Sequence, residues 1–134
     1  MADKLHFSLV SPERELFSGE VDQVDAPGSE GMFGVLPNHA PFMATLKSGA
    51  VTVFDGTEKT RIFVRGGFAD VTPQGLTILA EEAVDLKNLD FAAAEQSLQD
   101  AREDLADTQS EEDKIKAADR VAYFEALTLA AKAT

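Results

Sequence analysis

The sequence predicts an α+β protein, with an N-terminal antiparallel β-sandwich over residues 1–86 and a C-terminal antiparallel helical hairpin over residues 87–134. Up to about Leu86 the chain consists of short, β-rich stretches separated by turn residues, a pattern typical of a sandwich or flattened barrel. Beyond Leu86 the apolar residues recur every three or four positions, as they do on one face of a helix. A break at residues 108–110 divides this part into two helices, and so short a connection makes them antiparallel.

The β region begins with a strand in which Leu5, Phe7 and Leu9 alternate with polar residues. A period of two buries one face of a strand, so these three side chains are expected in the core. A hairpin is expected at Asp55-Gly56, because both residues tolerate a positive φ. Residues 72–75 carry Pro second and Gly fourth, which favours a type I turn between two further strands.

The stretch from Gly28 to Pro41 has three glycines at every third position, followed by two prolines four residues apart. This spacing predicts tight turns with positive φ, and neither a helix nor a long strand. The stretch offers Glu30 as an anion, and Asn38 and His39 as hydrogen-bonding groups. Two interpretations remain open on spacing alone: a structural corner between strands, or a loop that presents a binding surface.

The helical region has a candidate cap at Asn88 or Asp90, and Ser110-Glu111-Glu112-Asp113 resembles a capping box at the start of the second helix. The first helix is expected to bury one stripe of apolar residues, namely Phe91, Ala94, Leu98, Ala101 and Leu105. The second helix is expected to bury a corresponding stripe, namely Ile115, Ala118, Ala122, Ala126 and Leu129.

These stripes are rich in alanine, which buries little apolar area, so the hairpin is expected to need a second surface, either the β region or a partner. Val121, Tyr123, Phe124 and Leu127 lie partly off the expected inner stripe of the second helix. They are therefore candidates for that second contact, with a partner or with the β region. The alternative, that they only widen the core of the hairpin itself, stays open.

Composition excludes several functions. The 134 residues contain no cysteine and carry a net charge of −12, which excludes disulfides, thiolate chemistry and Cys-ligated zinc, and disfavours nucleic acid and anionic membranes. No apolar run could span a bilayer, and the N-terminus lacks signal-peptide character, so a cytoplasm-like location is expected.

Enzymatic chemistry is not expected, because two histidines and one tyrosine form no recognisable catalytic motif. The glycine pattern leads into Pro37 and not into a helix, so it does not form a phosphate cradle. The acids at 111–113 lack the alternating ligands and central glycine of a calcium loop, and are read as a solvated helix start. No catalytic, cofactor or metal residue is therefore assigned.

Two motifs carry a family resemblance. The first runs from Pro27 to Gly31 and from Gly34 to Pro41; the second is Arg65-Gly66-Gly67-Phe68-Ala69-Asp70-Val71 followed by residues 77–83. At this separation they resemble the epsilon subunit of F-type ATP synthases, the family that includes the chloroplast epsilon and mitochondrial delta subunits. The resemblance covers nearly the whole chain, and it implies a ten-stranded sandwich followed by a helical hairpin.

The resemblance implies a non-catalytic central-stalk subunit that couples ion-driven rotation of a membrane ring to ATP synthesis. Its location would be peripheral, on the cytoplasmic side of a bacterial inner membrane. The implied partners are the gamma subunit and the ring of c subunits. Carried over by position, Ser29, Glu30, Gly31 and His39 would contact the polar loops of the ring, with Glu30 paired to a basic residue.

In the family the hairpin can also extend toward the alpha/beta hexamer and inhibit ATP hydrolysis. From Asp85 onward this chain has twelve Asp and Glu against six Lys and Arg, a balance that weakens the case for inhibition through basic residues. The family's ATP motif is degenerate, because Asp90 is present but Ala93 stands where an arginine would bind phosphate. Weak or absent ATP binding is predicted. The alternative function is an ATP-sensing regulator or adaptor outside a rotary machine.

Overall fold

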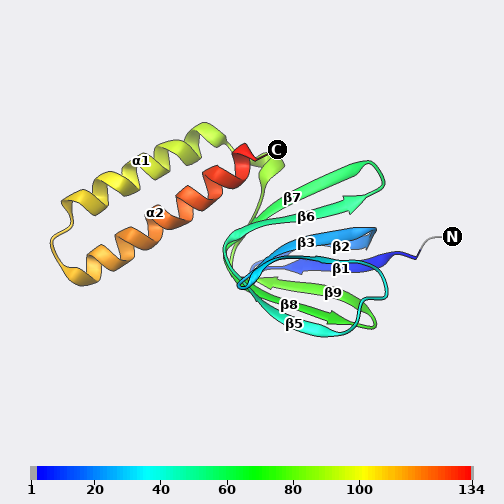
Figure 1. The fold of residues 1–134 in the computed structure, drawn as a ribbon. Coiled ribbons are helices and arrows are strands. Elements are labelled where there is room, and N and C mark those ends of the chain that lie inside the picture. Colours follow the sequence, from blue (N-terminus) through cyan, green and yellow to red (C-terminus); the bar gives the residue numbers. More distant parts are fainter. Residues whose placement is uncertain (1–2, 134) are drawn as a thin grey trace. The chain divides into compact units, whose positions relative to one another are not determined.

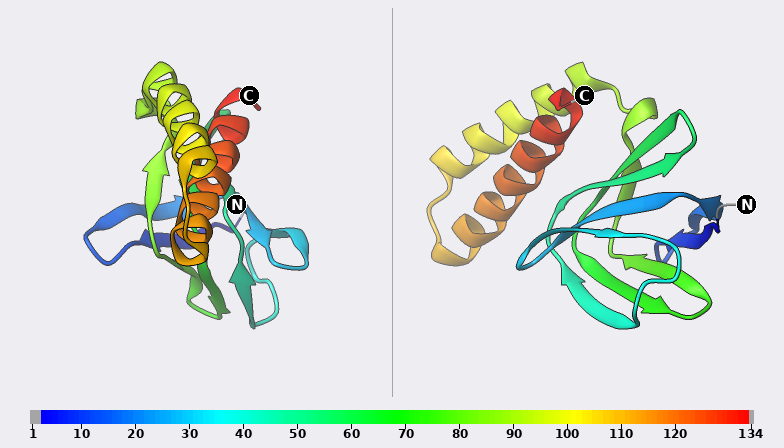
Figure 2. Two further views of the ribbon diagram at one scale, coloured as in Figure 1. Left: turned by 90° about the vertical axis from the view of Figure 1, so that its left-hand side faces the viewer. Right: turned by 45° about the vertical axis from the view of Figure 1, so that its right-hand side comes forward.

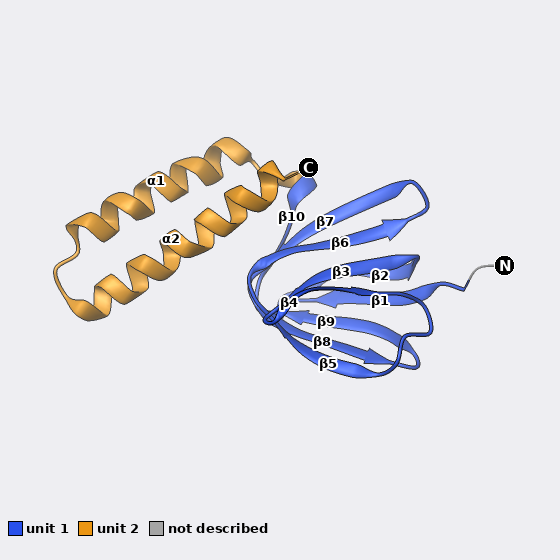
Figure 3. Cartoon of the chain, in the orientation of Figure 1, with its two compact units in different colours: residues 1–87 blue, residues 88–134 orange. Residues whose placement is uncertain are grey.

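The structure is a computed structural model that describes residues 3–133. The chain divides into two compact units, residues 1–87 and 88–134 (Figure 3). The first unit contains ten strands, namely β1 (Leu5–Val10), β2 (Glu15–Val21), β3 (Gln23–Gly28), β4 (Gly31–Val35), β5 (Phe42–Leu46), β6 (Gly49–Asp55), β7 (Glu58–Val64), β8 (Gly67–Thr72), β9 (Gly75–Ala80) and β10 (Ala83–Asp85). The 3-10 turn η1 (Leu86–Asn88) joins the two units. The second contains two helices, namely α1 (Phe91–Asp107) and α2 (Glu111–Lys132).

The ten strands form one sheet in the order β10-β7-β6-β3-β5-β8-β9-β1-β2, with β4 paired to β3. In Figure 1, β6 and β7 lie at one end of the fan of strands and β5, β8 and β9 at the other. Buried side chains from both ends join in one core, which confirms the predicted sandwich. One pair of this antiparallel sandwich is an exception, because β1 and β9 run parallel. The chain between them supplies the long crossover that a parallel pair requires.

The core follows the alternation expected of the first strand. Leu5, Phe7 and Leu9 are 4%, 0% and 0% exposed, while the intervening His6 is exposed on the other face. The strand lies between β2 and β9, so it is an interior strand of the sheet. Its three buried side chains can therefore contact neighbours on both sides.

The stretch from Gly28 to Pro41 forms turns at residues 29–30 and 37–38, as predicted, with the short strand β4 between them. Of its three glycines only Gly31 has a positive φ, of 134°. Glycine is required by close packing at Gly28, where a Cβ would lie 2.7 Å from the carbonyl oxygen of Gly31; a Cβ on Gly34 would lie 2.9 Å from Asp25 Oδ1, the end of a side chain that can move aside. Here the glycines allow two strands and their side chains to approach closely.

The turn between β6 and β7 forms where it was expected but is displaced by one residue. Asp55 pairs with Glu58, so Gly56 and Thr57 are the central residues, and of these Gly56 has a positive φ of 62°. Glycine at the first central position is typical of a type II′ hairpin.

A polar cluster fastens this hairpin to the start of β1. Lys4 Nζ lies 2.7 Å from both Asp22 Oδ1 and Asp55 Oδ1, and the Gly56 N–H donates to Asp22 Oδ2 at 2.6 Å. The hydrogen bonds to Asp22 and then Asp55 raise the pKa of Lys4 from 10.5 to about 12. The Gly56 amide, followed by Lys4, lowers the pKa of Asp22 below its ordinary 3.8.

This cluster makes stability depend on pH. The lowered pKa of Asp22 means that its contribution is present above about pH 4 and is lost as the pH falls through its folded-state pKa. The raised pKa of Lys4 means that its contribution is lost only above pH 10.5, as the pH rises toward about 12. We expect Asp22→Asn to lower the urea midpoint at pH 7, and the difference from wild type to shrink below pH 4. Glu13→Gln, at an exposed glutamate before β2, is the control; an equal loss there would contradict the assignment.

The helices begin at the caps that the sequence offers. Asp90, and not Asn88, caps α1 by accepting the Ala93 N–H at 3.1 Å, and Ser110 caps α2 by accepting the Asp113 N–H at 3.1 Å. The two helices lie side by side in both views (Figure 2). They are tied by Arg120 and Asp104, 3.2 Å apart, and by Lys132 Nζ, 5.8 Å from the Phe91 ring. Neither helix is long and apolar enough to cross a membrane within the described residues.

The stripe predicted for α1 is confirmed, since Ala94 and Ala101 are buried and Phe91, Leu98 and Leu105 are half-buried. The stripe predicted for α2 is wrong. Ile115 and Leu129 are each 69% exposed, and the buried positions are instead Ala117, Val121, Leu127 and Thr128. Alanines recur on several faces of this helix, so periodicity alone does not identify the buried one.

Candidate functional site

The predicted site residues Ser29, Glu30 and Gly31 form the exposed tip of the β3–β4 hairpin. This tip is fastened to a neighbouring strand, because the Ser29 N–H donates to the carbonyl oxygen of Thr45 on β5 at 2.9 Å. Gly28, just before the tip, also pairs with Leu46 on β5. The Glu30 carboxylate is therefore carried on a turn whose leading residues are hydrogen-bonded to β5.

Beside the tip lies a hollow of about 480 Å³ between β4 and β5, which we call the Glu30 hollow. Phe33 and Phe42, both lining it, meet edge to face with ring centroids 5.5 Å apart. Met32 and Met43, which also line it, are 61% and 71% exposed. An exposed carboxylate beside aromatic and thioether side chains suits a partner segment with both a basic and an apolar group.

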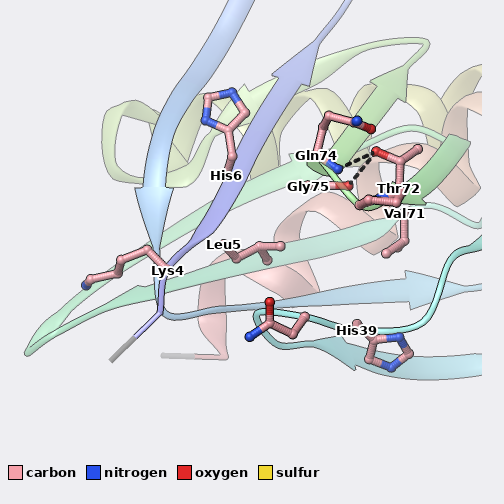
Figure 4. A pocket seen from close by; sticks show the side chains of 10 residues that line it. Lys4, Leu5, His6, His39, Val71, Thr72, Gln74 and Gly75 are labelled. Atoms are coloured by element: carbon pink, nitrogen blue, oxygen red, sulfur yellow. Dashed lines mark hydrogen bonds between the residues drawn. The ribbon is translucent and has the colours of Figure 1, made fainter. Parts of the chain in front are cut away.

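His39, the fourth predicted residue, does not line the Glu30 hollow. It belongs with Lys4 and His6 to a separate hollow of about 280 Å³. Figure 4 shows that the His6 and His39 rings point away from one another. His39 still adjoins the first hollow indirectly, because its ring centroid lies 5.2 Å from that of Phe42. The four residues predicted to form one contact therefore line two separate hollows.

A second apolar surface went unrecognised in the sequence. Met43, Phe68 and Leu79 point outward from β5, β8 and β9, and are 71%, 52% and 54% exposed. Phe68 and Leu79 are direct cross-strand partners and line a groove of about 540 Å³ with residues 10–12, which we call the apolar groove. The sequence did contain a signal for this surface. Phe68 on β8 and Leu79 on β9 are large apolar residues on the face opposite the buried one, where a strand with one solvated face usually carries polar residues.

Comparisons with known proteins agree with this architecture. Residues 4–86 match the family described as ATP synthase, Delta/Epsilon chain, beta-sandwich domain. An ATP synthase epsilon chain of Maricaulis maris is 58% identical over 127 residues, which are 95% of this chain and 96% of that one. The chain belongs to the bacterial ATP synthase epsilon family.

Solved structures extend the likeness to three dimensions. A chain in the cryo-EM structure of the Euglena gracilis mitochondrial ATP synthase, OSCP/F1/c-ring, has a TM-score of 0.82 and 26% identity, covering 97% of this chain and 82% of that one. A chain in the central stalk/c-ring structure of the Tetrahymena thermophila enzyme has a TM-score of 0.69, covering 96% of this chain and 97% of that one; its 15% identity supports the fold alone. Epsilon chains are non-catalytic subunits of ATP synthase, and this chain is one of that family.

In this epsilon-family chain, the residues proposed for hairpin contacts do not form one exposed face. Val121 and Leu127 are 9% and 3% exposed. Tyr123 and Phe124 are half-buried, with ring centroids 5.1 Å apart. The sequence analysis placed Val121 and Leu127 partly off the buried stripe of α2. That placement is wrong, because both side chains are buried and the predicted stripe lies on another side of the helix. Their role in contacting gamma stays a prediction.

Asp90 has a structural use in the hairpin, since its Oδ1 atom caps α1 through the Ala93 N–H. Ala93 itself occupies the position where the ATP motif of the family has arginine. A carboxylate engaged as a cap, with no guanidinium three residues on, lacks the charge-assisted contact that would hold a phosphate. Weak or absent ATP binding therefore stays the prediction for this chain.

Proposed function

We propose that this chain couples rotation of a membrane ring of c subunits to the gamma subunit of the central stalk, at the cytoplasmic face of a bacterial inner membrane. The ring contact comprises Ser29, Glu30, Gly31 and His39, with Glu30 paired to a basic ring residue. The observation that carries this proposal is the exposed Glu30 turn, hydrogen-bonded to β5 and flanked by an apolar hollow. A turn held in this way transmits lateral force to the sandwich better than a loop without such bonds.

The gamma subunit is proposed to occupy the apolar groove. Phe68 and Leu79 are exposed side by side on neighbouring strands, and apolar side chains of this size supply binding free energy when a partner removes them from water. The Euglena gracilis protein that this chain resembles is part of an F1/c-ring assembly. Because this chain belongs to the same family, gamma is the partner that we propose for the apolar groove.

The ring contact is tested by binding of the full chain, in complex with gamma, to detergent-solubilised c-ring. We expect Glu30→Gln to weaken binding about fivefold, because an exposed ion pair contributes up to about 1 kcal/mol. The double variant Glu30→Ala/His39→Ala should weaken it further, and the salt dependence of binding should become shallower. Glu58→Gln, an exposed glutamate at the β6–β7 turn, is the matched control. Unchanged binding of the double variant would refute the assigned ring contact.

The hairpin is proposed to be a structural element with little inhibitory effect on ATP hydrolysis. Acids outnumber bases two to one from Asp85 onward, so contacts that require basic residues on the hairpin are few. We expect the ATPase rate of the assembled complex to stay unchanged when the chain ends after Asn88. A large rise in that rate would show instead that the hairpin inhibits hydrolysis.

A further inference from the structure

One side of α2 carries apolar side chains that are open to solvent. It is the side that the sequence was expected to bury, and it consists of Ile115, Ala118, Ala122, Ala126 and Leu129. Ile115 and Leu129 are each 69% exposed. Ala118 and Ala122 are exposed as well, and Ala126 is half-buried. Because residues three or four apart lie on one side of a helix, these five form a continuous row, which we call the α2 stripe.

The α2 stripe has bulky side chains at its ends and alanines between them. Ile115 and Leu129 are fourteen residues apart, which is about 21 Å along a helix. Another helix is the element that packs along such a row, because its own side chains recur at the same spacing and fill the grooves of α2. Large side chains pack best opposite small ones. A fitting partner is therefore a helix of about four turns with large apolar side chains facing Ala118 and Ala122.

Acidic side chains lie at the N-terminal end of the α2 stripe. Glu111 is one helical turn before Ile115 and continues the row, and Glu112 follows it. The Glu111 and Glu112 side chains are 89% and 83% exposed. Lys114 Nζ lies 3.7 Å from Glu111, and Lys116 Nζ lies 3.9 Å from Glu112. Exposed ion pairs within a helix are weak, so both carboxylates can still interact with a partner.

The neighbouring helix adds to this negative charge. α1 has one basic residue, Arg102, against the acidic residues Glu95, Asp100, Glu103, Asp104 and Asp107. Arg102 itself lies 3.9 Å from Glu125 of α2. Charge complementarity across an interface favours a basic partner. The same charge disfavours a second copy of this hairpin, or an anionic membrane, as the occupant of the α2 stripe.

We propose that the α2 stripe binds a basic amphipathic helix of a protein other than gamma or the ring, with large apolar side chains over Ala118 and Ala122 and a basic residue beside Glu111. This inference goes beyond the proposed function, in which the ring and gamma occupy surfaces of the sandwich. The bound helix covers Ile115 and Leu129, and the removal of these two side chains from water stabilises the complex.

The test is calorimetric titration of a synthetic peptide into the full chain. The peptide has about 18 residues, enough for the length of the stripe, with leucine at every third or fourth position and lysine elsewhere. We expect the double variant Ile115→Gln/Leu129→Gln to bind it about tenfold more weakly, because both apolar contacts are lost. Both residues are exposed, so the helix content measured by circular dichroism should stay unchanged. An unchanged affinity would overturn the proposal.

Two controls separate the α2 stripe from non-specific attraction. Leu79→Gln makes the same kind of change at an apolar residue of the sandwich that is 54% exposed, and it should bind the peptide normally. A peptide of the same composition, with leucine and lysine in an order that has no apolar side, should bind at least about tenfold more weakly than the amphipathic one. Equal binding of the two peptides, or an equal loss in Leu79→Gln, would contradict the assignment to α2.

A fluorescent label on the α2 stripe tests whether gamma covers it instead. The chain has no cysteine, so Ala118→Cys can carry an environment-sensitive dye at a single position. We expect its emission to shift to the blue when the peptide binds, and to stay unchanged when purified gamma binds, as followed by co-elution. Ala92→Cys, at an exposed position of α1, should respond to neither. A shift on gamma binding would assign the stripe to the stalk and overturn the proposal. If gamma does not bind the chain at all, the proposed function fails, and the peptide titration still decides this proposal.

Discussion

A Gly67→Ala variant is expected to lose the stably folded sandwich. Gly67 begins β8 with a φ of 127°, and a Cβ there would lie 2.0 Å from the carbonyl oxygen of Leu79 and 2.9 Å from the Cα atom of Ala80. Both are backbone atoms of the paired strand β9, so no flexible side chain can move aside. We expect a loss of more than about 4 kcal/mol, a large part of the stability of an ordinary domain. Urea unfolding of the full chain, followed by circular dichroism, measures it.

Variants at two further glycines separate the steric clash expected at Gly67 from the strain of a positive φ. Gly56→Ala keeps the strain of a positive φ, of 62°, but its Cβ would have nothing within 4 Å, so a cost of about 1–2 kcal/mol is expected. Gly19→Ala meets Phe17 at an ordinary 3.7 Å and should change little. If Gly67→Ala cost no more than Gly56→Ala, the close approach of β8 and β9 would not be the reason for glycine at this position.

A Phe68→Asp variant is expected to lose the gamma subunit while keeping its fold. The Phe68 side chain lies outward and is 52% exposed, so an aspartate there remains solvated. In a complex it would place a charge in the middle of the apolar groove, at a cost of about 2 kcal/mol or more, which is roughly a 30-fold loss of affinity. Calorimetric titration of gamma into the chain measures the loss, and co-elution on a sizing column checks it.

The matched control for this variant is Phe54→Asp. Phe54 lies on β6, away from the groove, and Lys59 Nζ is 5.8 Å from its ring centroid, so the introduced carboxylate has a basic neighbour. Gamma should bind this variant normally. If Phe68→Asp left gamma binding intact, the assignment of the apolar groove to gamma would be wrong.

The proposed function requires the sandwich to transmit force from the Glu30 turn to the apolar groove. The Glu30 turn is bonded to β5 through Ser29 and Thr45, and β5 is paired along its whole length with β8. Force applied at the turn therefore reaches Phe68 through backbone hydrogen bonds of a continuous sheet. Hydrogen bonds between paired strands open less often than those of a solvated loop, because the core protects them from water.

Several features of this chain follow from the sequence alone. The alternation of Leu5, Phe7 and Leu9, the hairpin near Gly56, the caps at Asp90 or Asn88 and at Ser110, and the stripe of α1 each depend on residues within one or two turns of each other. Periodicity and turn chemistry are local properties of the backbone, so they can be read without the fold. The exposure of Glu30 belongs to the same class, because a charged residue between turn-forming residues is seldom buried.

Other features were decided only by the tertiary structure. Examples are the parallel pairing of β1 with β9, the need for glycine at Gly28, and the place of His39 in a separate hollow. Each depends on how strands come together in the folded sheet. The buried side of α2 was decided by packing, because alanines on several faces leave the periodicity without a unique solution. The place of Thr45, which lines both the Glu30 hollow and the apolar groove, is of the same kind. Two strands far apart in the sequence, β5 and β8, must pair in one register before Thr45 and Phe68 become neighbours, and register is set by the whole core.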